Sequence, residues 1–142
     1  GMPIQPSGAS GVRGKIIVDP ELEEGLRDLE GFSHLILLYH FNLAGQTRLL
    51  VQPFLDDQKR GVFATRAPTR PNPLGLSIVR LLGREGNILD IENVDILDQT
   101  PLLDIKPYVP AFDCPEDVRV GWLEKNRDQV RGKRSDDRFK ET

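Results

Sequence analysis

Residues 61–75 read GVFATRAPTRPNPLG, and the prolines in this stretch limit what the middle of the chain can form. Three prolines lie within six residues, which excludes a helix and a central strand because proline lacks the amide donor that both need. We therefore expect a stiff loop between two strands. Its arginines, Arg66 and Arg70, suit phosphate, carboxylate or base stacking, because a stiff loop loses little entropy on binding. The alternative is a rigid turn with a purely structural role.

Short runs of strand-forming residues flank this loop. Residues 34–41 (HLILLYHF) are almost wholly apolar, which predicts a strand buried on both faces. Residues 74–82 and 88–96 alternate apolar and polar positions, and the stretch 83–87 between them predicts a hairpin turn. Further strands are expected at residues 15–18, 48–51 and 62–65, and helices at residues 19–31 and 116–130.

The pattern of short strands and few helices predicts a mostly β protein, a small antiparallel β-barrel with peripheral helices. With 142 residues, of which 38% are hydrophobic, the chain suits a single domain over residues 1–142, with residues 131–142 as a frayed tail. A lone cysteine excludes an internal disulfide and a multi-thiolate zinc site. His34 and His40 would share one strand face and are interpreted as structural, so no metal is expected.

No apolar run approaches the roughly 20 residues that span a bilayer, and no signal peptide opens the chain, so we expect a cytoplasmic protein without a membrane contact. The net charge is −3, but residues 58–84 carry six basic and no acidic residues. This stretch predicts a phosphate-binding surface. The alternative is a solvated face whose arginines pair with acids from elsewhere in the fold.

A second motif occupies residues 98–110 (DQTPLLDIKPYVP). Asp104, Lys106 and Tyr108 alternate along it, so an extended strand would project the three side chains to one side. An acid, a cation and a phenol at one place form a set that can handle protons. The alternative is an exposed edge strand with one ion pair.

The two motifs, together with GFSHL at residues 31–35, resemble the TrmO family, also called the YaeB or TsaA-like family. The resemblance implies a small β-barrel that binds S-adenosylmethionine without a glycine-rich fingerprint, and no such fingerprint occurs in this sequence. It implies an S-adenosylmethionine-dependent methyltransferase that methylates N6 of N6-threonylcarbamoyladenosine beside the anticodon of tRNA. It also implies a homodimer with the cofactor near the subunit interface.

Site residues follow from the resemblance motif by motif. The expected catalytic residues are Asp104, Lys106 and Tyr108, with Asp104 or Tyr108 as the base. The residues expected around the cofactor are Pro6, Ser7, Gly8, Asn42, Leu43, Arg66, Leu76, Glu92, Asn93, Val94 and Asp95. Those expected to hold the tRNA anticodon loop are Arg60, Arg70, Asn72 and Arg80. The family usually has histidine where this chain has Asn42, and an extra strand before the Pro6 loop.

Two other functions fit the same residues. One is an RNA- or nucleotide-binding barrel without catalysis, which the departure at Asn42 favours. The other is a methyltransferase for a different acceptor, either a small metabolite or another RNA.

Overall fold

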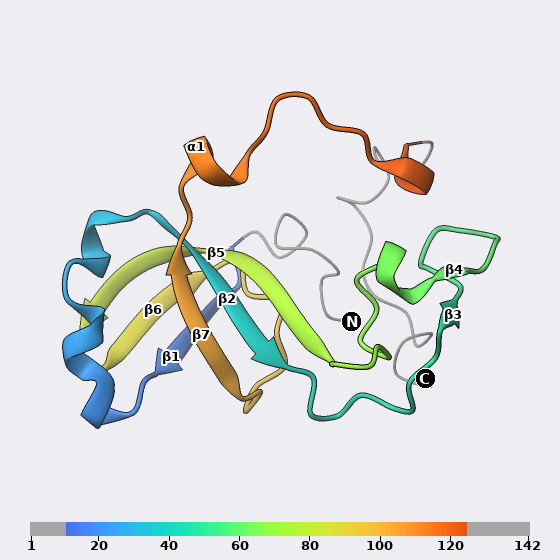
Figure 1. The fold of residues 1–142 in the computed structure, drawn as a ribbon. Helices are drawn as coiled ribbons and strands as arrows, with labels where there is room; N and C mark the ends of the chain where they lie inside the picture. Colours follow the sequence, from blue (N-terminus) through green and yellow to red (C-terminus); the bar gives the residue numbers. More distant parts are fainter. Residues whose placement is uncertain (1–10, 125–142) are drawn as a thin grey trace.

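The computed structural model describes residues 11–124, which form a five-stranded antiparallel sheet in the order β1-β6-β5-β2-β7 (Figure 1). Its strands are β1 (Arg13–Ile17), β2 (His34–His40), β5 (Leu74–Glu85), β6 (Ile88–Glu92) and β7 (Leu102–Pro107). A separate two-stranded sheet pairs β3 (Leu50–Val51) with β4 (Arg60–Gly61). Among the described residues no helix is long and apolar enough to cross a membrane.

Strand β5 organises the main sheet because it pairs along its whole length. Its first part pairs with β2, with Leu38 opposite Leu76 and His34 opposite Arg80. Its second part pairs with β6 after a bulge between Leu81 and Gly83. Because side chains alternate along a strand, residues 75, 77, 79 and 81 of β5 face the core, and residues 74, 76, 78 and 80 face outward.

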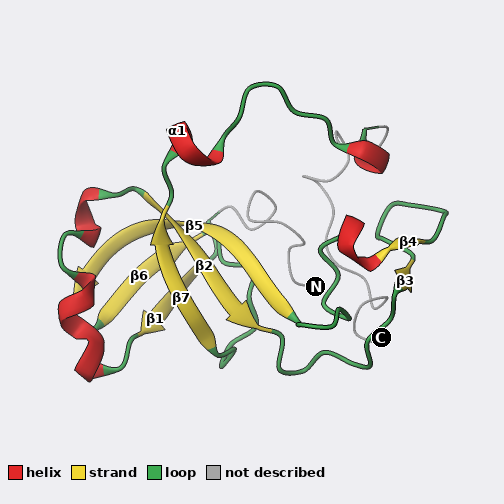
Figure 2. Cartoon of the chain, viewed as in Figure 1, coloured by secondary structure: helices red, strands yellow, loops and turns green. Residues whose placement is uncertain are grey.

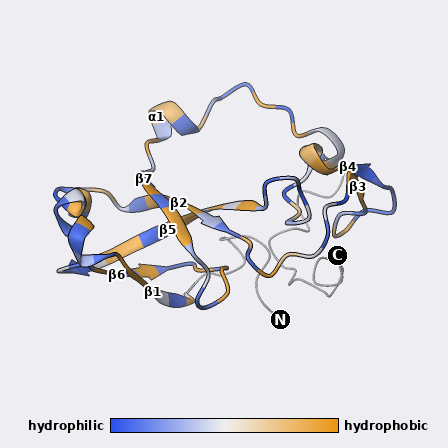
Figure 3. Cartoon of the chain, turned by 60° about the horizontal axis from the view of Figure 1, so that its bottom comes forward, coloured by the Kyte–Doolittle hydropathy of each residue, from blue (hydrophilic) through white to orange (hydrophobic). Residues whose placement is uncertain are grey.

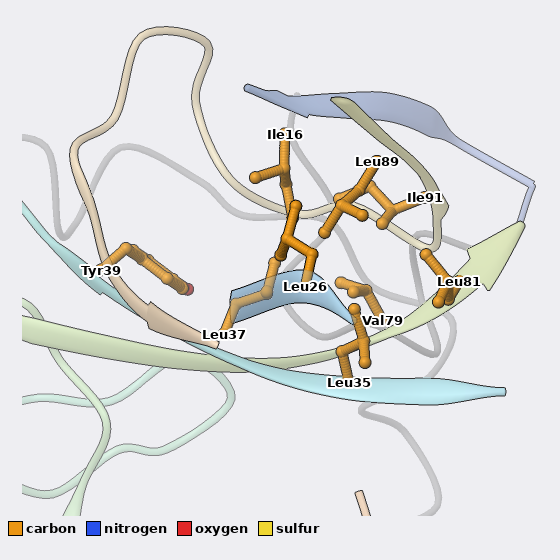
Figure 4. Close-up of a cluster of buried hydrophobic side chains, with 9 residues drawn as sticks. All are labelled: Ile16, Leu26, Leu35, Leu37, Tyr39, Val79, Leu81, Leu89 and Ile91. Atoms are coloured by element: carbon orange, nitrogen blue, oxygen red, sulfur yellow. The ribbon is translucent and has the colours of Figure 1, made fainter. Parts of the chain in front are cut away.

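The core lies on one side of this sheet, which we call the inner face. Figure 4 shows Leu26 in the middle of the cluster, between side chains of β1 and β6 and side chains of β2 and β5. Leu26 belongs to the 3-10 helix η2 (Pro20–Leu26), which Asp19 caps through a 3.0 Å bond from the Glu21 amide. A short 3-10 turn, η3 (Leu29–Gly31), then leads into β2.

Most of the expected strands are confirmed, as are the hairpin between β5 and β6 and the helical segment after Asp19, which is 3-10 rather than α. The expected strand at residues 62–65 is wrong: η4 (Val62–Ala64) is a 3-10 turn, because β4 ends where it begins. The helix expected at residues 116–130 is wrong over residues 116–124, the part of it that the structure describes. There, α1 (Pro110–Asp113) is followed by an extended segment and the 3-10 turn η5 (Gly121–Leu123) (Figure 2). The tail at residues 131–142 lies outside the described residues.

The closed barrel is not found among residues 11–124, where no pairing joins β1 to β7. Leu26 of η2 packs into the core cluster, and β7 ends at Pro107, which has no amide to donate to a further strand. The fold is therefore mostly β with an open sheet.

Candidate functional site

A buried chain of hydrogen bonds crosses the inner face near the start of β5. The Tyr39 hydroxyl lies 2.8 Å from the Ser77 hydroxyl, which donates to Asp95 Oδ1, also at 2.8 Å. Tyr39 and Ser77 come from the paired strands β2 and β5, and Asp95 follows β6. Three elements therefore fix the orientation of one carboxylate.

The Tyr39 ring is seated by a glycine. Gly75 is the register partner of Tyr39, and a Cβ at Gly75 would lie 2.6 Å from Tyr39 Cζ and 2.8 Å from Phe41 Cζ. The two rings meet edge to face with centroids 5.4 Å apart. Only a residue without a side chain fits beneath them, so Gly75 sets the position of the Tyr39 hydroxyl.

Burial changes the acid–base properties of this chain. It raises the pKa of Asp95 above 3.8, and the hydrogen bond from Ser77 opposes that shift. Burial also raises the pKa of Tyr39, to which the negative charge of Asp95 contributes, while the Ser77 bond and the positive charge of Arg66 lower it. Arg66 is exposed and forms no ion pair within residues 11–124.

The turn after β6 places Asp95. Asn93 has a left-handed backbone (φ 71°), and its side-chain oxygen accepts from the Gly11 amide at 3.3 Å. The amides of Asn93 and Val94 both donate to the Val12 carbonyl. Val94 packs against Gly14 of β1, where an added Cβ would lie 3.2 Å from its methyl group. The stretch 92–95 is thus a tight, pinned turn.

The structure brings together some of the expected cofactor residues and separates others. Asp95 belongs to the inner-face chain, and Asn93 and Val94 form the turn that places it. Glu92 lies on the outer face of β6 and pairs with Arg13 at 3.9 Å, and Arg66 is exposed in the proline loop. Asn42 and Leu43 are exposed in the turn that follows Phe41. Leu76 lies on the outer face of β5, away from the Tyr39 chain. Pro6, Ser7 and Gly8 lie outside the described residues.

The expected catalytic residues lie on the outer face, at the edge strand β7. Asp104 and Lys106 project to one side, as predicted, and form a 2.8 Å ion pair. The Lys106 hydrogen bond is the main cause that lowers the pKa of Asp104 below 3.8. Tyr108 lies beside His34, with ring centroids 6.4 Å apart, and burial is the main cause that raises its pKa above 10.0. At neutral pH, Asp104 is therefore charged and Tyr108 is protonated.

The expected tRNA-contacting arginines divide into two groups. Arg70 is held by the loop itself, because its guanidinium donates to the carbonyls of Thr65 (2.9 Å) and Ala67 (3.1 Å). Arg60 donates to Asp56 at 2.7 Å. Arg80 is exposed on the outer face and forms no ion pair in the described part of the chain. Asn72 is exposed in the loop, so the acid-free stretch is part anchored loop and part free surface.

The Asp56–Arg60 pair gives a prediction for acid unfolding. The Asp56 side chain is fully buried, and the Arg60 bond is the main cause that lowers its pKa from 3.8 to about 2. Because the folded-state pKa is the lower one, charged Asp56 stabilises the fold above pH 3.8, and this contribution is lost as the pH falls toward about 2.

We therefore expect Asp56→Asn to be destabilised at neutral pH, with a difference from wild type that shrinks on acidification. Urea unfolding at a series of pH values measures this difference. Asp57→Asn is the matched control, because Asp57 is exposed. A difference that stays constant down to about pH 2 would contradict the assignment.

Two residues of this site were not among the expected ones, Tyr39 and Ser77. Their signal in the sequence is weak but readable: each is a polar residue on the core-facing side of an otherwise apolar strand. A buried hydroxyl needs a partner, and two such hydroxyls on paired strands can supply one to each other. No metal-binding group of three or more His, Cys, Asp or Glu side chains occurs within residues 11–124.

Comparison with known proteins gives one family and several relatives. The sequence profile described as tRNA-methyltransferase O N-terminal domain matches residues 1–114. A probable S-adenosyl-L-methionine-binding protein of Pyrococcus abyssi is 59% identical over 138 residues, which are 97% of this chain and 75% of that protein. The human tRNA (adenine(37)-N6)-methyltransferase is 39% identical over 127 residues, covering 83% of this chain and 28% of the human protein.

The fold also matches a solved structure. The crystal structure of TrmO from Pseudomonas aeruginosa superposes with a TM-score of 0.70 at 43% sequence identity. The match covers 84% of this chain and 53% of that one. This chain therefore spans about half the length of that solved relative, and less than a third of the human one.

Proposed function

The chain belongs to the tRNA-methyltransferase O N-terminal domain family, and from this premise we propose that it binds S-adenosylmethionine and methylates tRNA. The proposed acceptor is N6 of N6-threonylcarbamoyladenosine beside the anticodon. The observation that carries the proposal is the Tyr39–Ser77–Asp95 chain, together with the exposed Arg66, which has no ion-pair partner among residues 11–124. A fixed carboxylate and an unpaired guanidinium are the complementary charges that an amino-acid-bearing cofactor needs.

The residues present fit such a cofactor in chemistry. Arg66 would hold the cofactor's carboxylate, because it is exposed and has no ion-pair partner among the described residues. Asp95 would accept from its ammonium or ribose hydroxyl groups, since its Oδ1 is already oriented by Ser77. The pinned turn at residues 92–94 would border the site. Asn42 would offer an amide where the family usually has an imidazole.

A homodimer is part of the proposal. Leu74 and Leu76 remain 49% and 46% exposed on the outer face of β5, beside the half-buried Leu38 of β2. Figure 3 colours the strands by hydropathy, with hydrophobic positions in orange. An apolar strip of this kind on a sheet favours association. Because Asp104 and Lys106 lie on the face of the sheet opposite Asp95, the proposed site would combine the Asp104–Lys106 pair of one chain with the Arg66–Asp95 region of its partner.

When bound, S-adenosylmethionine supplies a methyl group on a positively charged sulfur. The acceptor nitrogen is a poor nucleophile because its lone pair is spread into the purine and the urea carbonyl. Asp104, charged at neutral pH and held by Lys106, would accept the proton of that nitrogen. Tyr108, protonated at neutral pH, would donate a hydrogen bond. Arg80 and Arg70 would lie along the anticodon-loop phosphates.

The experiment that tests the proposal is mass spectrometry of tRNA nucleosides after incubation with protein and S-adenosylmethionine. We expect a methyl gain on threonylcarbamoyladenosine. A gain on another nucleoside would show that this nucleoside, and not threonylcarbamoyladenosine, is the acceptor. No gain on any nucleoside would contradict the proposed RNA methyltransferase activity.

Lys106→Ala tests the β7 residues. We expect turnover to fall about tenfold or more, because Asp104 loses the partner that orients it, while the affinity for S-adenosylmethionine measured by calorimetry stays unchanged. Lys15→Ala is the matched control: Lys15 is similarly exposed and forms a 2.6 Å pair with Asp90 on β6. Equal turnover in both variants would exclude the Asp104–Lys106 pair from the chemistry.

A second function, RNA or nucleotide binding without catalysis, is favoured by one observation. The lowered pKa of Asp104 makes it a weak base, and the raised pKa of Tyr108 makes its reactive phenolate scarce. Mass spectrometry of the tRNA nucleosides separates the two functions, because a domain that binds without catalysis gives no methyl gain. Calorimetry with S-adenosylmethionine shows in addition whether such a domain binds this cofactor. Salt-sensitive tRNA binding would remain in both cases.

A further inference from the structure

The extended segment after α1 ends on the Arg66-bearing loop. Trp122 in η5 donates from Nε1 to the Ala64 carbonyl at 2.8 Å. The Arg60 guanidinium lies over the indole ring, 5.8 Å from its centroid, and is itself held by the buried Asp56. Two segments that are distant in sequence, residues 56–64 and Trp122, therefore meet in one cluster, which we call the Trp122 clasp.

The loop that the clasp holds lies apart from the main sheet. It is held by the two-residue strands β3 and β4, by a small apolar cluster of Val51, Val62 and Ala67, and by the hydrogen bonds that Arg70 donates to the carbonyls of Thr65 and Ala67. That cluster is separate from the core of the main sheet. Because this small cluster is separate from the main core, a hydrogen bond and a cation–π contact from another segment of the chain add to what holds the loop in place.

The clasp also ties this loop to the strand with the proposed catalytic residues. Residues 114–119 are exposed and run from α1, which follows β7, across to the region of β3 and β4 (Figure 1). The segment is anchored at its start, where the Val109 amide donates to Asp113 at 2.8 Å, and at its end by Trp122. The matching family profile ends at residue 114, before this segment.

We propose that Trp122 is a positioning residue for the loop at residues 62–66, and through it for Arg66. Ala64, which accepts the Trp122 bond, lies two residues before Arg66, so the clasp limits where the guanidinium can lie relative to Tyr39 and Asp95. The effect of Trp122 on cofactor binding rests on the proposed function. The ordering of the loop by Trp122 is independent of that function.

Hydrogen exchange of the free protein tests the ordering directly. Trp122→Phe keeps an aromatic ring next to Arg60 and removes the N–H donor to Ala64. We expect faster amide exchange at residues 62–67 in this variant, with unchanged exchange in β2 and β5. Val118→Ala is the matched control, because Val118 is exposed in the same segment. Unchanged exchange at residues 62–67 in Trp122→Phe would overturn the inference.

Trp122 is the one tryptophan of the chain, so its fluorescence reports on the clasp without a label. We expect Arg60→Ala to shift the emission to longer wavelength and to raise acrylamide quenching, because the indole loses the guanidinium above it. In wild type, titration with S-adenosylmethionine is expected to change the emission with the dissociation constant that calorimetry gives. Binding heat with no emission change would overturn the coupling between the clasp and Arg66.

The affinity for S-adenosylmethionine completes the test. We expect Trp122→Phe to weaken binding about threefold to tenfold, which corresponds to the free energy of one net hydrogen bond. The melting temperature of the protein is expected to stay unchanged. If wild type itself gives no binding heat, the proposed cofactor is wrong, and the exchange experiment still decides the clasp. If wild type and Trp122→Phe bind equally, Trp122 does not position Arg66.

Discussion

Replacement of Gly75 by alanine is expected to lower the free energy of unfolding by about 1–3 kcal/mol, the usual range for overpacking a core. The added methyl would lie 2.6 Å from Tyr39 Cζ and 2.8 Å from Phe41 Cζ, closer than carbon atoms approach without displacement. The Tyr39 ring cannot move freely, because it is buried and hydrogen-bonded to Ser77. Urea unfolding measures the loss.

Gly61→Ala is the matched control for this substitution. Gly61 has φ −60°, which alanine adopts readily, and no atom lies within 4 Å of an added Cβ. We expect Gly61→Ala to leave the free energy of unfolding unchanged or to raise it slightly, because alanine has fewer backbone conformations than glycine in the unfolded chain. Gly75→Ala should also weaken cofactor binding, since the displaced Tyr39 carries Ser77 and Asp95 with it. Equal stability of the two variants would exclude close packing at Gly75.

Asp95→Asn is expected to weaken S-adenosylmethionine binding by about tenfold to a hundredfold, the range for a lost charge-assisted hydrogen bond. The asparagine oxygen still accepts from Ser77, so the fold is kept. Burial disfavours the charged carboxylate, so we expect the variant to melt at a slightly higher temperature than wild type at neutral pH. Calorimetry and a thermal melt measure the two effects.

The raised pKa of Asp95 sets the pH dependence of binding. Wild type should lose affinity on acidification at a higher pH than an ordinary aspartate would give, because the carboxylate protonates early. This acid loss should be absent from Asp95→Asn. Asp90→Asn serves as the control, since Asp90 is paired with Lys15 on the outer face. Strong binding by Asp95→Asn would remove Asp95 from the cofactor site.

Local patterns predicted the elements whose cause is local. Alternation along residues 102–107 placed Asp104 and Lys106 on one side of β7, because side chains of any extended strand alternate. The hairpin between β5 and β6 followed from its turn residues, and Gly86 there has φ 62°. The same reasoning failed at residues 62–65, because a strand needs a neighbour to pair with, and sequence alone does not supply one.

Helix propensity also failed where distant contacts dominate. Residues 116–124 have a helix-favouring composition, yet the segment is extended until η5. Its end is fixed by the hydrogen bond from Trp122 to Ala64, 58 residues earlier in the chain. A contact over that separation outweighs a propensity of a few tenths of a kcal/mol per residue, on the order of the host–guest values.

The sequence by itself determined the stiff proline loop, the order of the strands along the chain and the family, because these depend on residue types and on spacing. Only the tertiary structure decided which side chains of each strand face the core and which face outward. That choice buried Ser77 and Tyr39 beside Asp95 and left Leu76 and Asp104 on the opposite face. The physical reason is that the side chains of a strand alternate, so the packing of one face assigns every residue of the other.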